Sequence, residues 1–287
     1  MKVKSCVILV LLAAALAGGC LSGPQEQPGA KEGNVHAVAS IAPLAEFTRA
    51  VGGERVNVSV LVPPGVEPHT FEPAPSQIRQ VSEADIFIEN GAGLEFWMDH
   101  MIQVNPKMKV VDTSRGAKLI SEEGSDEPDP HLWLSPRSAR IQVENICQGL
   151  SEIDPEGAEV YLANRDSYIR ELDRLDAQLN ETLKGQRKRS FLVHHPAWTY
   201  LARDYGLEQI PLMENEREPG PRYLAGVIEQ AKAIGIDTIF VEPEYNPKAA
   251  EVIARELNAS VVTIDPLASD YLNNLRIVGS RIGESLR

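Results

Sequence analysis

Two hydrophobic patterns alternate along the chain after residue 34. Short runs rich in β-branched residues predict strands, and stretches with apolar residues three and four positions apart predict amphipathic helices. The expected strands are residues 36–41, 56–62, 85–89, 108–111, 190–194, 209–212, 237–241 and 260–264. Helical patterns separate most of them, at residues 44–51, 76–83, 94–103, 198–205, 222–233, 247–257 and 271–286. This alternation is typical of parallel sheets covered by helices on both faces.

A longer helical pattern separates the fourth strand from the fifth. Asp154-Pro155 supplies an N-cap followed by proline in the first turn, and helical composition continues to Lys184-Gly185. A helix of about thirty residues is about 45 Å long. One apolar stripe runs along it at helical spacing, formed by Tyr161, Tyr168, Leu172, Leu175, Leu179 and Leu183.

The fold class expected from these patterns is α/β, with two similar parallel-sheet lobes and a ligand cleft between them. The lobes would be residues 35–153 and 187–287, joined by one long rigid α-helix at residues 154–186. A long surface helix within a single domain is the alternative.

Residues 1–34 have the features of an exported and anchored protein. Two lysines precede an uncharged apolar run at residues 6–17, and two glycines then lead to Cys20. This predicts a signal peptide at residues 1–19, too short to span a bilayer stably. Cys20 resembles the lipidated cysteine of a lipobox, although Ala17 stands where leucine is usual, so a cleaved signal with an incidental Cys20 is the alternative. Residues 20–34 contain no aromatic or β-branched side chain and predict a flexible tether.

These features predict an exported protein held by a lipid anchor on the outer face of the cell membrane.

The formal net charge is −13, and loss of Lys2 and Lys4 with the signal peptide would make it −15. Nucleic acid requires a basic surface, so we expect no nucleic-acid partner. Only Cys147 of the three cysteines would remain in the folded body, which leaves no disulfide. We expect a monomer.

Four polar residues are candidates for a metal site. Parallel sheets bind ligands beyond the carboxyl ends of their strands. His69 and His131 lie in proline-rich loops, whereas His195 and Asp265 stand at the ends of expected strands. Three imidazoles and one carboxylate are ligands typical of tetrahedral zinc, and they also accept manganese or iron(II). Each residue has a structural alternative, and strand periodicity does not decide between His194 and His195.

Longer motifs resemble the zinc- and manganese-binding receptors of ABC importers. The resemblance covers residues 35–287 and includes VPPGVEPHTFEP, DPHLWLSP, HPAWTYLARDYGL and TIDPL. It implies four metal ligands, which are His69, His131, His195 and Asp265. It also makes His194 a flanking residue. Because some manganese members carry glutamate at the third position, the resemblance favours Zn2+ over Mn2+ or Fe2+.

The resemblance implies binding without catalysis. The protein would capture a divalent metal ion with high affinity outside the cytoplasm and deliver it to the permease of an ABC importer. Glu242 would support the site or shape its loop. Many zinc members have a histidine-rich loop before the second ligand, but residues 121–130 contain no histidine before His131.

Three alternatives remain open. A zinc-dependent hydrolase would need an open coordination position and a general base, for which Glu242 and Glu244 are candidates, although the chain has no HExxH motif. A receptor of the same architecture for siderophore or corrin complexes would need an aromatic or arginine-lined cleft. A metal-binding surface adhesin is the third.

Overall fold

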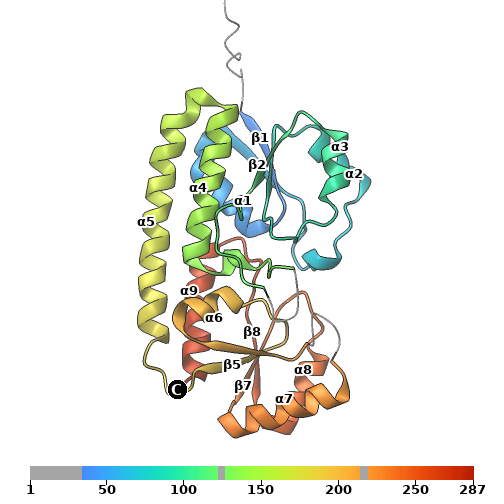
Figure 1. The fold of residues 1–287 in the computed structure, drawn as a ribbon, viewed down its shortest axis with the longest axis vertical. Coiled ribbons are helices and arrows are strands. Elements are labelled where there is room, and N and C mark those ends of the chain that lie inside the picture. Colours follow the sequence, from blue (N-terminus) through green and yellow to red (C-terminus); the bar gives the residue numbers. More distant parts are fainter. Residues whose placement is uncertain (1–33, 122–126, 214–218) are drawn as a thin grey trace, which may run out of the picture. The chain divides into compact units, whose positions relative to one another are not determined.

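The computed structural model describes residues 34–121, 127–213 and 219–287 (Figure 1). The predicted signal peptide, most of the predicted tether and Cys20 therefore lie outside the described residues. Within the described ranges, no helix is both long enough and apolar enough to cross a membrane.

The first half of the chain forms a parallel four-stranded sheet with the order β2-β1-β3-β4. Its strands are β1 (Val35–Ala39), β2 (Val56–Val60), β3 (Ile86–Glu89) and β4 (Lys109–Asp112). Helix α1 (Ala42–Gly52) packs against one face, and α2 (Pro75–Ser82) and α3 (Met98–Val104) lie on the other side (Figure 1). The buried strand residues explain the apolar runs from which these strands were expected.

The second half repeats this plan with the order β6-β5-β7-β8. The strands are β5 (Ser190–Val193), β6 (Glu208–Pro211), β7 (Thr238–Val241) and β8 (Ser260–Thr263). The helices are α6 (Thr199–Tyr205), α7 (Pro221–Ile234), α8 (Lys248–Leu257) and α9 (Tyr271–Ser285). Two sheets with the same strand order confirm the expectation of two similar α/β lobes.

Two long helices connect the sheets. Helix α4 (Pro136–Ile153) leads through a 3-10 turn at Pro155–Gly157 into α5 (Ala158–Leu183), which has 26 residues and is about 39 Å long. The apolar stripe of α5 is buried, as expected, against α1 and α4 of the first lobe and α9 of the second. The side chain of Asp154 caps the 3-10 turn by accepting a hydrogen bond from the Gly157 amide.

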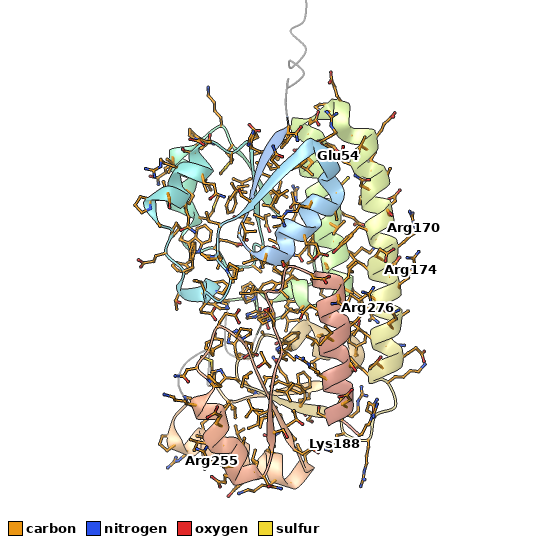
Figure 2. The ribbon with its side chains drawn as sticks, turned by 180° about the vertical axis from the view of Figure 1, so that it is seen from behind. Glu54, Arg170, Arg174, Lys188, Arg255 and Arg276 are labelled. Atoms are coloured by element: carbon orange, nitrogen blue, oxygen red, sulfur yellow. The ribbon has the colours of Figure 1, made fainter. Side chains whose placement is uncertain are left out.

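The contact between α5 and α9 depends on a glycine. A Cβ atom at Gly279 would lie 2.2 Å from Cδ2 of Leu179, so any larger residue would require the buried Leu179 side chain to shift. Nearby on the surface, the Arg276 guanidinium donates a hydrogen bond to Gln178 (Figure 2). Helix α5 therefore packs against the second lobe as well as against the first.

One hydrophobic core extends from the first sheet through α5 to α9. Phe47 of α1 and Tyr271 of α9 meet edge to face, with ring centroids 4.7 Å apart. The Trp133 indole donates a hydrogen bond to the Pro266 carbonyl (2.8 Å), and the Tyr271 hydroxyl donates one to the Trp133 carbonyl (2.7 Å). Lobes with a large apolar interface move little relative to one another, so this core favours a rigid arrangement.

Candidate metal site

The three candidate histidines lie in loops from both lobes. His69 belongs to a 3-10 turn (Pro68–Thr70) after β2, and the Glu67 carboxylate fixes this turn by accepting a hydrogen bond from the His69 amide (3.0 Å). His131 precedes the 3-10 turn at Leu132–Leu134, which leads into α4. His195 follows the carboxyl end of β5. The loops therefore converge at the sheet ends where the sequence predicted a site.

The imidazoles meet through their Nε2 atoms. Nε2 of His131 lies 3.1 Å from Nε2 of His69 and 3.1 Å from Nε2 of His195. Two nitrogens bound to tetrahedral zinc at 2.0–2.1 Å are about 3.3 Å apart, so these separations are close to those of ligands. His131 and His195 are only 4 % and 3 % exposed. Among the described residues, His69, His131 and His195 form a group whose potential ligand atoms are close enough together to hold one metal ion.

The environment keeps His69 and His195 neutral. Burial, reinforced by the electrostatic interaction with His131, lowers the pKa of His69 to about 4. Burial and the neighbouring histidines lower the pKa of His195 well below its ordinary value. Neutral imidazole is the form that binds metal, so the lowered pKa values favour coordination at neutral pH.

A carboxylate orients His131. Oδ1 of Asp129 accepts hydrogen bonds from the His131 backbone amide (2.8 Å) and from Nδ1 of its ring (2.9 Å). Burial would raise the pKa of Asp129, but the electrostatic interaction and the hydrogen bonds with His131 outweigh it and lower the pKa. With the Nδ1 proton held by Asp129, Nε2 of His131 presents its lone pair to the other two rings.

His195 rather than His194 joins the cluster. The amide of His194 continues the sheet by donating a hydrogen bond to the Phe240 carbonyl (2.8 Å), and its ring lies beside Tyr245 (centroids 5.0 Å apart). The His195 ring stacks on Tyr245, and the Tyr245 hydroxyl lies 3.3 Å from Nδ1 of His195. The structure thus brings the His195 ring to His131, whereas the His194 ring lies beside Tyr245.

Asp265 does not belong to this close group of ligand atoms. Its Oδ1 accepts a hydrogen bond from the Leu267 amide (2.7 Å), which caps the turn after β8. Burial raises its pKa. The next two residues, Pro266 and Leu267, line the cavity at the histidines. Coordination by Asp265 therefore stays a prediction.

Two glutamates follow β7 near the cluster. Glu242 is 1 % exposed, and its Oε1 accepts a hydrogen bond from the Trp198 indole (3.3 Å). Burial raises its pKa to about 8. Glu244 lines the cavity with the three histidines, and burial, with the charges of Asp265 and Glu67, raises its pKa to about 7. From the sequence, Glu244 is expected only as a candidate general base. The feature that could have identified it as a site residue is its position as a second carboxylate just beyond a strand end.

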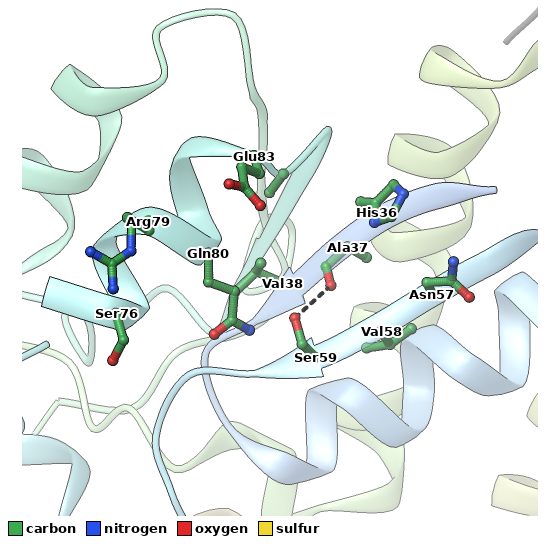
Figure 3. A pocket seen from close by; sticks show the side chains of 11 residues that line it. His36, Ala37, Val38, Asn57, Val58, Ser59, Ser76, Arg79, Gln80 and Glu83 are labelled. Carbon is green, nitrogen blue, oxygen red and sulfur yellow. Dashed lines mark hydrogen bonds between the residues drawn. The ribbon is translucent and has the colours of Figure 1, made fainter. Parts of the chain in front are cut away.

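A larger but more open groove lies on the first sheet, between β1, β2 and α2 (Figure 3). The Ser59 hydroxyl donates a hydrogen bond to the Ala37 carbonyl at its floor (3.3 Å). His36 is its only histidine, and it is exposed. The groove therefore lacks the converging ligands of the histidine cluster.

The architecture and the cluster together define a class: two-lobed α/β proteins with metal-ligating side chains at the junction of the lobes. The chain belongs to the family described as zinc-uptake complex component A, periplasmic, whose sequence model matches residues 37–283. It is 31 % identical to the manganese-binding lipoprotein MntA of Halalkalibacterium halodurans, over 90 % of this chain and 87 % of MntA. It is 32 % identical to the high-affinity zinc uptake system protein ZnuA of Bacillus subtilis, over 90 % of this chain and 85 % of ZnuA.

A crystal structure of ZnuA has the same fold. It superposes with a TM-score of 0.86 at 37 % identity and covers 88 % of this chain and all of that one. Proteins of this family are metal-binding receptors and not enzymes, which confirms the expected absence of catalysis. The hydrolase and adhesin alternatives are not favoured.

Proposed function

We propose that this protein captures a divalent transition metal outside the cytoplasm and delivers it to an ABC importer. Zinc is the favoured cargo and manganese is possible. The observation that carries the proposal is the convergence of three Nε2 atoms, two of them 3.1 Å from the third, on loops of both lobes. The relatives named for zinc uptake and manganese binding support the same conclusion.

The proposed ligands are His69, His131, His195 and Asp265. Three neutral imidazoles and one carboxylate would leave a net charge of about +1 on a bound divalent ion. A modest tilt of the lobes would bring Asp265 within coordination distance. A site closed by four protein ligands has no free position for a reacting water, which favours binding over hydrolysis. Glu242, hydrogen-bonded to Trp198 at the end of β7, would support the loop of His195.

We further propose an anchored, monomeric protein. Residues 1–19 would be removed, Cys20 lipidated, and residues 20–34 would tether the binding domains to the outer face of the cell membrane. The domains would be residues 35–153 and 187–287, with residues 154–186 as the connecting helix. The permease of an ABC importer would be the partner. Support comes from relatives that are named lipoproteins.

The test is metal analysis of the protein produced without its signal peptide and without added metal, followed by competition between zinc and manganese. We expect one zinc ion per chain. His195→Ala should weaken zinc binding more than about a hundredfold, beyond the loss typical of residues that only support a ligand. His194→Ala is the matched control and should change the affinity by less than about threefold. Equal losses in both variants would contradict the proposed ligand set.

A further inference from the structure

Glu244 has an oxygen that the hydrogen bonds of the fold leave without a partner. The residue lies just beyond β7, and its side chain lines the same small cavity as His69, His131 and His195. Its Oε2 is buried and accepts no hydrogen bond from any residue that the structure describes. A buried carboxylate oxygen is stable only when a donor or a cation compensates it.

No positively charged side chain of the described fold offers that compensation within the cavity. Neither lysine nor arginine is among the residues that line it. The nearby charges are the carboxylates of Glu67 and Asp265, which repel Glu244. Carboxylates and imidazoles therefore line one cavity, although the close group of potential ligand atoms contains the three histidines alone. A divalent cation bound there would compensate the carboxylate charge and accept the imidazole lone pairs.

Glu242 provides an internal comparison. It also has a buried Oε2 with no partner among the described residues. However, its Oε1 is held by the Trp198 indole, and its side chain is not among those that line the cavity. Of the two glutamates after β7, Glu244 is the one exposed to the histidine cluster.

We infer that Glu244 is a metal ligand that contributes to specificity, supplying a carboxylate oxygen beside the three histidine nitrogens. The inference rests on the proposed function and adds a residue to its site. With Asp265 also bound, two carboxylates would neutralise a divalent ion, and the site would offer three nitrogen ligands and two residues with oxygen ligands. Imidazoles suit zinc, whereas carboxylates suit manganese, so Glu244 widens the range of metals toward manganese.

The experiment compares four proteins: wild type, Glu244→Gln, Glu244→Asp and Glu229→Gln. Glutamine keeps the shape and removes the charge, aspartate keeps the charge on a shorter side chain, and Glu229 is an exposed residue of α7 that controls for net charge. Zinc affinity is measured by competition with a chromophoric chelator, and manganese affinity by calorimetry. The visible spectrum of the cobalt(II) form reports the ligands directly, because its d–d bands depend on coordination number and donor type.

Ligation predicts that Glu244→Gln weakens zinc binding at least about tenfold and manganese binding more, with altered cobalt bands. Glu244→Asp should retain part of the affinity, and Glu229→Gln should match wild type. Circular dichroism and urea unfolding check that each variant folds.

Three results would overturn the inference. If Glu244→Gln matches Glu229→Gln in affinity and spectrum while His195→Ala still loses zinc, Glu244 is not a ligand and the proposed function stands. If affinity falls but the cobalt bands stay unchanged, Glu244 acts only through its charge. If wild type binds neither metal, the proposed function and the inference fail together.

Discussion

Asp129 offers a direct test of how the fold prepares His131. Its Oδ1 accepts both the backbone amide and Nδ1 of His131, and both residues are buried. The Nδ1 hydrogen bond fixes the tautomer that leaves the Nε2 lone pair free for a metal. Asp129→Asn keeps an oxygen acceptor of nearly the same shape and removes the negative charge.

The magnitude follows from the hydrogen bond to Nδ1 of His131. A hydrogen bond to a charged group contributes about 1 kcal/mol more than one between neutral groups. The backbone bond is the same with and without metal, so only the ring bond, which strengthens when the metal polarises the imidazole, affects binding. Its weakening gives a loss of about 1–2 kcal/mol in metal binding, which is about five- to thirtyfold in affinity. This overlaps the ten- to hundredfold range typical of residues that orient a metal-bound histidine.

The assay is zinc competition at pH 7.5, combined with nitrogen-15 NMR of the His131 ring to identify its tautomer. Asp237→Asn is the control, because Asp237 is an exposed carboxylate that pairs with Lys188 on the surface. We expect a loss of about tenfold for Asp129→Asn and less than about twofold for Asp237→Asn. Affinity within twofold of wild type, with an unchanged tautomer, would refute the positioning role of Asp129.

Two further predictions concern the stability of the metal-free protein in urea. Gly226→Ala in α7 should stabilise the protein by about 1 kcal/mol, because a Cβ atom there contacts no other atom. Gly279→Ala should instead destabilise it by about 1–3 kcal/mol, because the added Cβ atom overpacks against Leu179. An equal gain in stability from both substitutions would contradict the close α5–α9 contact. Burial raises the pKa of Glu95 from 4.5 to about 7, so the folded state keeps this proton where the unfolded state loses it. Stability should therefore fall by up to about 3 kcal/mol as pH rises from 4.5 to 7, and Glu95→Gln should lack this slope.

The strands of both sheets could be predicted because the residue pattern that indicates each strand lies within the strand itself. Each of the eight strands was expected within about two residues of its bounds, since buried parallel strands require runs of apolar and β-branched residues. Most strand ends were placed one or two residues too late, for example at Ile41 instead of Ala39. The apolar run continues there into the start of α1, and periodicity does not mark the change.

The site was only partly predictable. Strand ends identified the regions of His69, His195 and Asp265, but alternation left His194 and His195 equivalent until motif resemblance separated them. The structure distinguishes them by their neighbours, since Nε2 of His195 lies 3.1 Å from Nε2 of His131, whereas the His194 amide continues the sheet. The role of Glu244 depends on which face of a turn its side chain occupies, and no sequence period determines that.

Contacts between the two lobes could not be predicted from the sequence, because they join residues more than a hundred positions apart. The Trp133 indole reaches the Pro266 carbonyl, so it links the loop of one proposed ligand, His131, to the turn of another, Asp265. Trp133 is two residues from His131, and Pro266 directly follows Asp265. If the lobes tilted without breaking the Trp133–Pro266 hydrogen bond, the axis of the tilt would lie close to the metal site. The proposed metal ligands would then move only slightly, whereas surfaces far from the site would move more. The fold therefore favours a site largely formed before the metal arrives, whose affinity depends on rigid support more than on a large closing motion.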